Sequence, residues 1–343
     1  MKVRTAMVGA VLALVAATAL IVSASGSAKS EQDAFLAGVV SDVGRFNDKG
    51  FNQLSLKGCK TGAKKAKGTC RALESRSTAD YIPNFARLAR DGADISVATG
   101  FLLADGTATI AKRFPKSKYT IVDYSTKAPP FANDKGKVLY KNVVGLTFAT
   151  NQNSYMIGCL AGLMAKRDGG NTISAVGGIK IPTVDIFIAA YRAGASKCAP
   201  GTKTLIDYSQ EFVDQAKCNE LAINQLDQGS KVVFAVAGNC GLGALDAAKE
   251  AGAWGVGVDS DQSFLGAHIL TSAVKRVDVA VETVILSAKN GTYKGGTDLN
   301  FNLKNKGVAV GKISSKVPKA YITRMNALGA QILAGKIKPP TKV

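Results

Sequence analysis

Residues 232–237 read VVFAVA, an apolar run in which hydrophobic and polar residues do not alternate. A strand that is apolar on both faces is typical of a parallel sheet covered by helices on both sides. Similar short runs, rich in Val and Ile, recur along the chain and alternate with longer segments of helical period. The expected strands cover residues 35–41, 69–74, 95–99, 119–123, 143–148, 173–177, 203–208, 232–237, 255–259, 269–273 and 308–310. This alternation predicts βαβ units and parallel sheets.

The number of expected strands exceeds what a single twisted parallel sheet usually holds, so we expect two doubly wound lobes. The helix expected after Asn151 opens a second series of units that resembles the first series. The first crossover between the lobes is therefore expected near residues 149–151. A chain of 343 residues is long enough for two such domains.

The chain carries 44 basic and 25 acidic residues, which gives a formal net charge of +19. Such a positive charge is typical of proteins that bind nucleic acids. RNA-binding modules, however, also need aromatic stacking platforms beside their basic residues. The densest basic run, residues 64–67, reads KKAK and has no aromatic neighbour. We interpret it as a solvated helix end and expect no nucleic-acid partner.

The first residues predict export. Lys2 and Arg4 precede an apolar or small stretch over residues 6–24, and small residues follow to Ala28. This pattern is typical of a signal peptide over residues 1–28; the alternative is an uncleaved membrane anchor, because the run lies near the lower limit for spanning a bilayer, roughly 18 residues. The first cysteine is Cys59, so a cysteine-linked lipid anchor is not expected. Both readings place the rest of the chain outside the cytoplasm, in the periplasm or at the cell surface.

Six cysteines in an exported chain predict three disulfides rather than a metal site. The only histidine is His268, and no cysteine pair has the spacing of a zinc knuckle. Sequence alone leaves many pairings open. The order of the expected elements favours Cys59 with Cys70, and Cys218 with Cys240. That choice leaves Cys159 with Cys198.

Polar and glycine-rich segments follow several expected strands. Asp42 and Asp123 follow strands of the first lobe, while Gly238 and Asp259 follow strands of the second. Open parallel sheets bind ligands at the carboxyl ends of their strands. The sequence therefore predicts a ligand-binding cleft between the two lobes.

The segment DVGRFNDKGFNQ, residues 42–53, places a carboxylate at a strand end and an aromatic residue at the start of a helix. Phe51 either packs into the interior or covers a flat ligand, and its residue type alone does not decide between these roles. Asn52 directly follows it.

Further segments of the chain belong to the same pattern as residues 42–53: Gly100-Phe101, Gly177-Gly178, Ala237-Gly238, GVGVDSDQ at 255–262 and LTSAVKRVD at 270–278. Together and in this order they resemble the basic membrane protein family, the purine-nucleoside-receptor-like substrate-binding proteins of ABC importers. The resemblance implies a type I periplasmic-binding-protein fold of class α/β, in which three crossovers join two doubly wound parallel-sheet lobes. It implies a first lobe of residues 34–149 plus 263–291 and a second lobe of residues 150–262 plus 292–343.

The resemblance also implies a nucleoside ligand, an ABC permease as partner, a monomeric chain and no cofactor. Phe51 and Phe212 would stack on the two faces of the base, which suits a flat aromatic ligand. Asp42 and Asn52 would meet the base edge. Asp259 and Lys275 would hold the ribose. Phe101, Asp123 and Gly238 complete the expected binding residues, and Asp123 either contacts the ligand or orients the hinge.

Some positions depart from the family pattern. Cys240 stands where the family usually has a small residue, and the stretch between Gln262 and Ile269 is short. Two other functions stay open: an extracytoplasmic nucleoside-cleaving enzyme, or the same fold with a sugar or signalling ligand. The chain has no GxSxG motif and a single histidine, which disfavours common nucleophilic triads.

Overall fold

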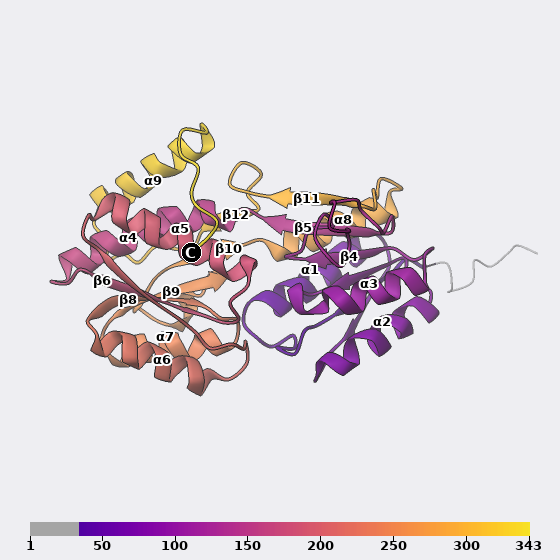
Figure 1. The fold of residues 1–343 in the computed structure, drawn as a ribbon, viewed down its shortest axis with the longest axis horizontal. Coiled ribbons are helices and arrows are strands. Elements are labelled where there is room, and N and C mark those ends of the chain that lie inside the picture. The colour runs from indigo at the N-terminus through magenta and orange to yellow at the C-terminus, as the bar shows by residue number, and fades with distance from the viewer. Residues whose placement is uncertain (1–33) are drawn as a thin grey trace, which may run out of the picture. The chain divides into compact units, whose positions relative to one another are not determined.

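Two six-stranded sheets form the framework of residues 34–343, which are the residues that the computed structural model describes (Figure 1). The predicted signal peptide, residues 1–28, lies outside this range. None of the described helices is long and apolar enough to cross a membrane.

The first sheet has the order β11-β5-β4-β3-β1-β2, and all its strands are parallel. Its central strands are short and fully buried, as expected for a sheet covered on both faces. The strands are β1 (Leu36–Val40), β2 (Thr69–Leu73), β3 (Ile95–Ala98), β4 (Tyr119–Val122), β5 (Val143–Phe148) and β11 (Thr297–Phe301).

Four helices cover the first sheet. Helices α1 (Phe51–Lys65) and α8 (Val277–Lys289) share one hydrophobic core with the strands. Helices α2 (Tyr81–Arg90) and α3 (Ala104–Arg113) form the core on the other face. The short helices η2 (Thr78–Asp80) and η3 (Phe101–Leu103) lead into α2 and α3.

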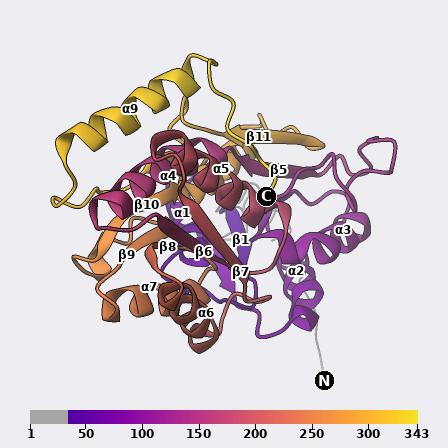
Figure 2. The same cartoon turned by 60° about the vertical axis from the view of Figure 1, so that its left-hand side comes forward.

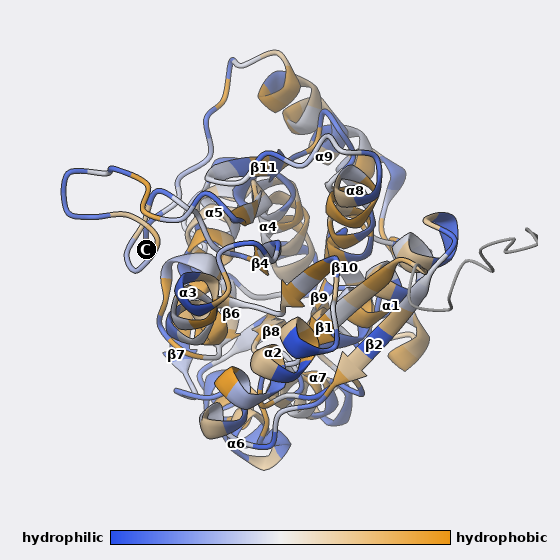
Figure 3. Cartoon of the chain, turned by 90° about the vertical axis from the view of Figure 1, so that its right-hand side faces the viewer, coloured by the Kyte–Doolittle hydropathy of each residue, from blue (hydrophilic) through white to orange (hydrophobic). Residues whose placement is uncertain are grey.

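The second sheet has the order β12-β10-β9-β8-β6-β7 and is parallel except for the edge strand β12. Strand β8, which contains all of the VVFAVA run except its last residue, lies inside this sheet between β6 and β9. The strands are β6 (Thr172–Gly177), β7 (Lys203–Tyr208), β8 (Ser230–Val236), β9 (Trp254–Asp259), β10 (Ile269–Lys275) and β12 (Val308–Val310). Hydrophobic residues gather along strands such as β10 (Figure 3).

Helices also cover both faces of the second sheet (Figure 2). Helices α4 (Thr150–Arg167), α5 (Pro182–Cys198) and α9 (Lys319–Leu333) lie on one face. Helices α6 (Gln215–Asp227) and α7 (Cys240–Glu250) lie on the other. The short helix η4 (Ser263–Leu265) connects β9 to β10. The prediction of two doubly wound lobes is confirmed.

The chain passes between the lobes three times, as the predicted fold requires. It crosses at Ala149 between β5 and α4, at Arg276 between β10 and α8, and through residues 302–307 between β11 and β12. The strand pairing corrects the expected boundaries. Strand β10 pairs with β9 and lies in the second lobe rather than the first, and β11 pairs with β5 and lies in the first lobe rather than the second.

The three disulfides join the pairs that the sequence favoured. Cys59–Cys70 links α1 to β2, Cys159–Cys198 links α4 to α5, and Cys218–Cys240 links α6 to α7. Their Cα–Cα separations are 5.8, 5.0 and 5.5 Å, within the range that a disulfide requires. All six cysteines are therefore paired.

Candidate functional site

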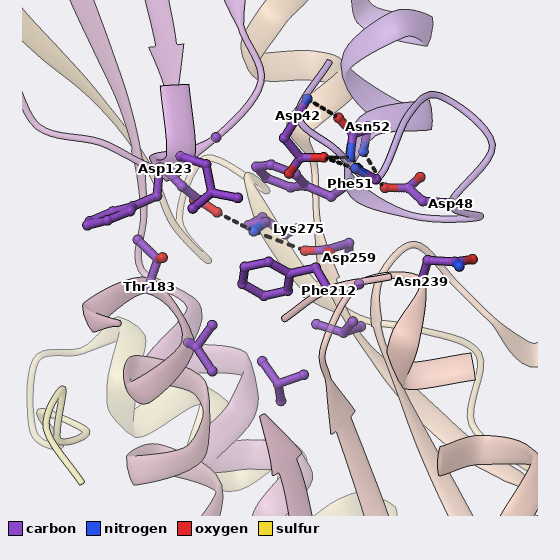
Figure 4. A pocket seen from close by; sticks show the side chains of 18 of the residues that line it. Asp42, Asp48, Phe51, Asn52, Asp123, Thr183, Phe212, Asn239, Asp259 and Lys275 are labelled. Carbon is purple, nitrogen blue, oxygen red and sulfur yellow. Dashed lines mark hydrogen bonds and ion pairs between the residues drawn. The ribbon is translucent and has the colours of Figure 1, made fainter. Parts of the chain in front are cut away.

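A pocket lies where the carboxyl ends of the two sheets face each other, and residues of both lobes line it (Figure 4). This is the location that open parallel sheets favour for ligands. All of the expected binding residues line this interlobe pocket: Asp42, Phe51, Asn52, Phe101, Asp123, Phe212, Gly238, Asp259 and Lys275.

One end of the pocket, which we call the Asp42 end, consists of Asp42, Asp48 and Asn52. Asp42 follows β1 and is 7% exposed. Its Oδ1 accepts hydrogen bonds from Asn52 Nδ2 and from the backbone N–H of Gly44, both at 2.7 Å. Asn52 Oδ1 in turn accepts from the backbone N–H of Asp42 at 3.0 Å. This reciprocal pair fixes both side chains at the pocket wall.

Asp48 holds the backbone and Asn52 of this end in place by hydrogen bonds. It was not among the expected site residues. Its carboxylate accepts from the backbone N–H groups of Gly50, Asn52 and Gln53, at 3.0, 2.7 and 3.1 Å. It also accepts from Asn52 Nδ2 at 3.0 Å. A carboxylate at the first turn of a helix satisfies backbone donors that have no partner in the helix. Asp48 therefore anchors the start of α1 and orients Asn52.

Burial changes the acidity of the Asp42 end. Removal from water raises the pKa of Asp42 to about 6, although the hydrogen bonds from Gly44 and Asn52 act in the opposite direction. Burial also raises the pKa of Asp48. Asp42 can therefore change from a hydrogen-bond acceptor to a donor within a mildly acidic pH range.

Phe51 begins α1 and lines the pocket from the first lobe. Its ring lies against Gly100, whose φ is +101° and at which an added Cβ would come within 2.7 Å of Phe51 Cε1. Both the backbone conformation and the close approach of the ring favour glycine at this position. Gly100 thus leaves room for the ring at the pocket wall.

Phe212 lines the pocket from the second lobe, in the loop between β7 and α6. Its ring packs against Gly178, where a Cβ would collide with it. The backbone carbonyl of Phe212 accepts from the N–H of Cys240 at 3.0 Å. Figure 4 shows Phe51 and Phe212 on opposite sides of Lys275, so each lobe contributes one aromatic ring.

The other end of the pocket, the Lys275 end, is an ion triad. Lys275 Nζ lies 2.6 Å from Asp123 Oδ2 and 3.0 Å from Asp259 Oδ1. Asp123 follows β4 of the first lobe, whereas Asp259 and Lys275 end β9 and β10 of the second. Both aspartates have positive φ, 58° and 63°, a conformation that is uncommon for residues other than glycine and clusters at functional sites.

The triad keeps Lys275 charged. Burial alone would lower the pKa of Lys275, but attraction by Asp123 and Asp259 outweighs burial, and the pKa is raised. The Nζ atom also lies 4.5, 5.4 and 5.7 Å from the ring centroids of Phe51, Phe187 and Phe148, within the range of cation–π attraction. With two carboxylates for one ammonium, ionised acids would give this end a surplus negative charge that suits hydroxyl donors.

A second contact joins the lobes beside the triad. Ser260 Oγ donates to the backbone carbonyl of Lys49 at 2.8 Å. Ser260 follows β9 of the second lobe, and Lys49 belongs to the loop before α1 of the first. The interlobe pocket is therefore bordered by two contacts that need both lobes in their present positions.

Within residues 34–343, no cluster of three His, Cys, Asp or Glu side chains could hold a metal ion. The site instead combines aromatic rings, a buried carboxylate–amide pair and an ion triad. Such an arrangement can bind a neutral ligand with a flat ring and several hydroxyl groups.

Residues 35–342 match the family described as ABC transporter substrate-binding protein, PnrA-like. The chain belongs to this family. It is 32% identical to the ABC transporter nucleoside-binding protein of Lactococcus lactis, over 93% of each chain. It is 30% identical to the CD4+ T-cell-stimulating antigen of Listeria monocytogenes, over 96% of this chain and 97% of the relative.

The fold of this PnrA-like protein is also that of a solved ABC transporter solute-binding protein from Aeropyrum pernix. The two structures agree with a TM-score of 0.79 at 23% identity, over 90% of this chain and 93% of the other. The expected family and type I periplasmic-binding fold are thus confirmed.

Sequence reasoning missed several lining residues of this PnrA-like protein. Thr183 and Phe187 belong to α5, and Asn239 precedes α7. The expectation that ligand-binding residues follow the carboxyl ends of strands does not point to residues inside a helix, such as Phe187. Asp48 could have been found, because an acidic residue just before a helix is a typical capping signal.

Proposed function

We propose that this protein captures a nucleoside in the interlobe pocket and delivers it to the permease of an ABC importer. The observation that carries the proposal is the pair of rings, Phe51 and Phe212, one from each lobe of the pocket. A nucleobase has two flat faces, and stacking on aromatic side chains contributes about 1–3 kcal/mol per base. The name of the Lactococcus relative, a nucleoside-binding protein, supports the same ligand class.

In the proposed complex the base lies at the Asp42 end and the sugar at the Lys275 end. The carboxylate of Asp42 accepts from an N–H group of the base, and Asn52, whose two Nδ2 hydrogens go to Asp42 and Asp48, meets the base edge through its Oδ1 as an acceptor. A purine such as hypoxanthine offers an N–H group on its six-membered ring. At the other end Asp259 accepts from ribose hydroxyl groups, while Lys275 donates to a hydroxyl oxygen.

Transport follows from closure of the lobes. A ligand that contacts both lobes binds the closed form more tightly than the open form and shifts the population toward it. The contacts Lys275–Asp123 and Ser260–Lys49 join the lobes in the closed form. The permease then recognises the closed, loaded protein, which acts as a monomer outside the cytoplasm.

Binding without chemical turnover distinguishes this proposal from nucleoside cleavage. The family consists of substrate-binding proteins of ABC transporters, which supports binding. If the protein is incubated with inosine, we expect the inosine to stay intact over hours, as measured by chromatography. Release of hypoxanthine and ribose that persists through purification would support a cleaving enzyme instead.

Mass spectrometry of the native protein, purified without added ligand, tests the proposal directly. We expect a bound species with the mass of a nucleoside, which appears as that nucleoside after denaturation. The Phe51→Ala variant, prepared in parallel, should retain much less of it. Exclusive recovery of a free sugar or another small molecule would contradict the proposal.

A further inference from the structure

A side groove adjoins the interlobe pocket near the Lys275 end. Three residues, Phe101, Asp123 and Thr183, line both spaces. Figure 4 shows Asp123 and Thr183 together on one side of the pocket, away from Asp48 and Asn239 on the other side. The groove encloses about 970 Å³, part of it open to solvent, against about 640 Å³ measured in the same way for the pocket. The two spaces therefore adjoin at these three residues, and the groove is not the smaller of them.

Lys275 lies at the border of the two spaces. Phe51, which lines only the pocket, and Phe148, which lines only the groove, have ring centroids 4.5 and 5.7 Å from the same Nζ atom. A ligand group that contacts the triad is thus within a few ångströms of the groove. In the proposed complex this group is the sugar, so the groove lies beyond the sugar and away from the base.

Apolar surface dominates the groove. Phe148, Pro182 and Ile186 line it together with Ala128 and Phe101. Phe148 is buried, whereas Ile186 is partly exposed at the groove wall. A hydrocarbon group that enters the groove would exchange water for these side chains, which is favourable in proportion to the apolar area buried.

Three of the polar side chains that line the groove already have partners in the protein, and Thr150 and Thr183 line it as well. Ser125 Oγ donates to Asp298 at 2.5 Å, and Tyr124 Oη donates to the carbonyl of Pro129. Thr147 Oγ1 accepts from Asn300 Nδ2 at 3.1 Å. These groups offer little to a polar ligand, because their hydrogen bonds would have to be exchanged.

The charge of the groove excludes anions. Among the described residues that line it, none is a lysine or an arginine, and the one charged side chain is Asp123. The nearby ammonium of Lys275 is already paired with two carboxylates. A phosphate group there would face a like charge without a cation to bind it.

We propose that the pocket accepts nucleosides whose 5′ carbon carries an uncharged, apolar substituent, which occupies the side groove. This inference rests on the proposed function, because it assumes that the sugar lies at the Lys275 end. The 5′ carbon lies outside the ribose ring, so a substituent on it can point away from the triad while the ring hydroxyls on C2′ and C3′ stay bound. Nucleoside 5′-phosphates are excluded by the same groove.

Calorimetric titration of the full mature chain tests the proposal with adenosine, 5′-deoxy-5′-methylthioadenosine, its butylthio homologue and adenosine 5′-monophosphate. We expect the alkylthio nucleosides to bind at least as tightly as adenosine, with about two- to fourfold tighter binding for each methylene that the groove buries. The 5′-monophosphate should bind at least a hundredfold more weakly. The proposal would be overturned if butylthioadenosine bound more than tenfold more weakly than adenosine. It would also be overturned if the monophosphate bound with the same affinity as adenosine.

Two isoleucine variants locate the substituent. Ile186→Trp fills the groove. It should weaken the binding of butylthioadenosine at least tenfold, while adenosine binds as before. Ile223→Trp makes the same change at an exposed position of α6 that does not line the groove, and both ligands should bind it normally. Equal loss of both ligands in Ile186→Trp, or no loss of either, would contradict this location. Absence of binding by adenosine and every other nucleoside would instead overturn the proposed function itself.

Discussion

The Asp42 end and the Lys275 end of the pocket differ in how they are assembled. Asp42, Asp48 and Asn52 all belong to one lobe, within a single loop and the first turn of α1. Asp123 and Lys275 come from different lobes and meet at 2.6 Å. The Asp42 end can therefore form before closure, whereas the Lys275 end is complete only when the lobes meet.

This difference assigns separate tasks to the two ends. A preformed carboxylate–amide pair recognises its ligand at little cost in ordering, which favours selectivity. An end that both lobes build couples ligand binding to closure, because its contacts exist in only one of the two conformations. In the proposed complex, recognition of the base selects the ligand, and the contacts of the sugar at the Lys275 end couple its binding to closure of the lobes.

The largest effect is expected for Lys275→Met. The change leaves Asp123 and Asp259 close together without the ammonium, and removal of one partner of a buried ion pair costs about 3–5 kcal/mol. We expect a clear loss of thermal stability and at least a hundredfold weaker nucleoside binding, measured by calorimetry.

Lys57→Met is the matched control for this lysine. Lys57 also pairs with an aspartate, Asp278 at 2.9 Å, but its side chain is 64% exposed. Exposed pairs contribute about 0–1 kcal/mol, so stability and affinity should change little. Equal effects of the two variants would mean that the triad has no special role.

Phe51→Ala should weaken nucleoside binding by about ten- to a hundredfold, because it removes a stacking contact of about 1–3 kcal/mol. Phe264→Ala truncates a phenylalanine that is 63% exposed and outside the pocket, and should bind normally. If both variants fold and bind as tightly as the unchanged protein, Phe51 serves packing rather than recognition.

Affinity for inosine should depend on pH through the Asp42 end. Because the pKa of Asp42 is about 6, its carboxyl is mostly ionised at pH 7 and mostly protonated at pH 5. Protonation removes the acceptor for the N–H group of the base, so binding should weaken by about tenfold over this range. Asp42→Asn should bind weakly at both pH values; a full pH response in this variant would assign the titration to another group.

The same shift has a consequence for stability without ligand. The folded state holds the Asp42 proton more tightly than the unfolded state, whose reference pKa is 3.8. The unfolded state therefore binds fewer protons between this value and about 6, and the contribution of Asp42 to stability falls as the pH rises through that window. Asp42→Asn should remove this component from the pH profile of thermal unfolding.

A smaller effect on affinity is expected for the disulfide nearest the pocket. Cys218–Cys240 joins the starts of α6 and α7, next to the loops of Phe212 and Asn239. The double variant Cys218→Ser/Cys240→Ser should lose about 2–4 kcal/mol of stability and bind nucleoside a few-fold more weakly.

Cys59→Ser/Cys70→Ser provides the comparison, because this bridge lies away from the lining residues. It should lose stability to a similar extent and keep its affinity. A loss of affinity in this variant alone would contradict the role that we give to the bridge at Cys240.

The fold could be predicted because buried parallel strands leave a strong signal. Runs such as VVFAVA are apolar on both faces, and they marked most strands of both sheets. The edge strand β11 was missed, since in Thr297–Phe301 only Phe301 is buried. The exchange of β10 and β11 between the lobes was also missed, because an apolar run does not indicate which neighbour it pairs with.

The candidate site was predictable where residues follow strands and matched family segments. The geometry of the Lys275 end was not, because a sequence does not show that strand-end aspartates from two lobes meet one lysine. The rings of Phe148 and Phe187 belong to the same surroundings, and they look like ordinary core residues in the sequence. Their role depends on contacts between segments far apart along the chain.

Calorimetric titration with inosine, hypoxanthine and ribose under one set of conditions tests the difference between the two ends most directly. We expect inosine to bind most tightly, hypoxanthine to bind measurably through the preformed Asp42 end, and ribose to show no binding at millimolar concentration. Ribose binding as tightly as inosine, with hypoxanthine inactive, would contradict the proposed nucleoside site and favour a sugar ligand.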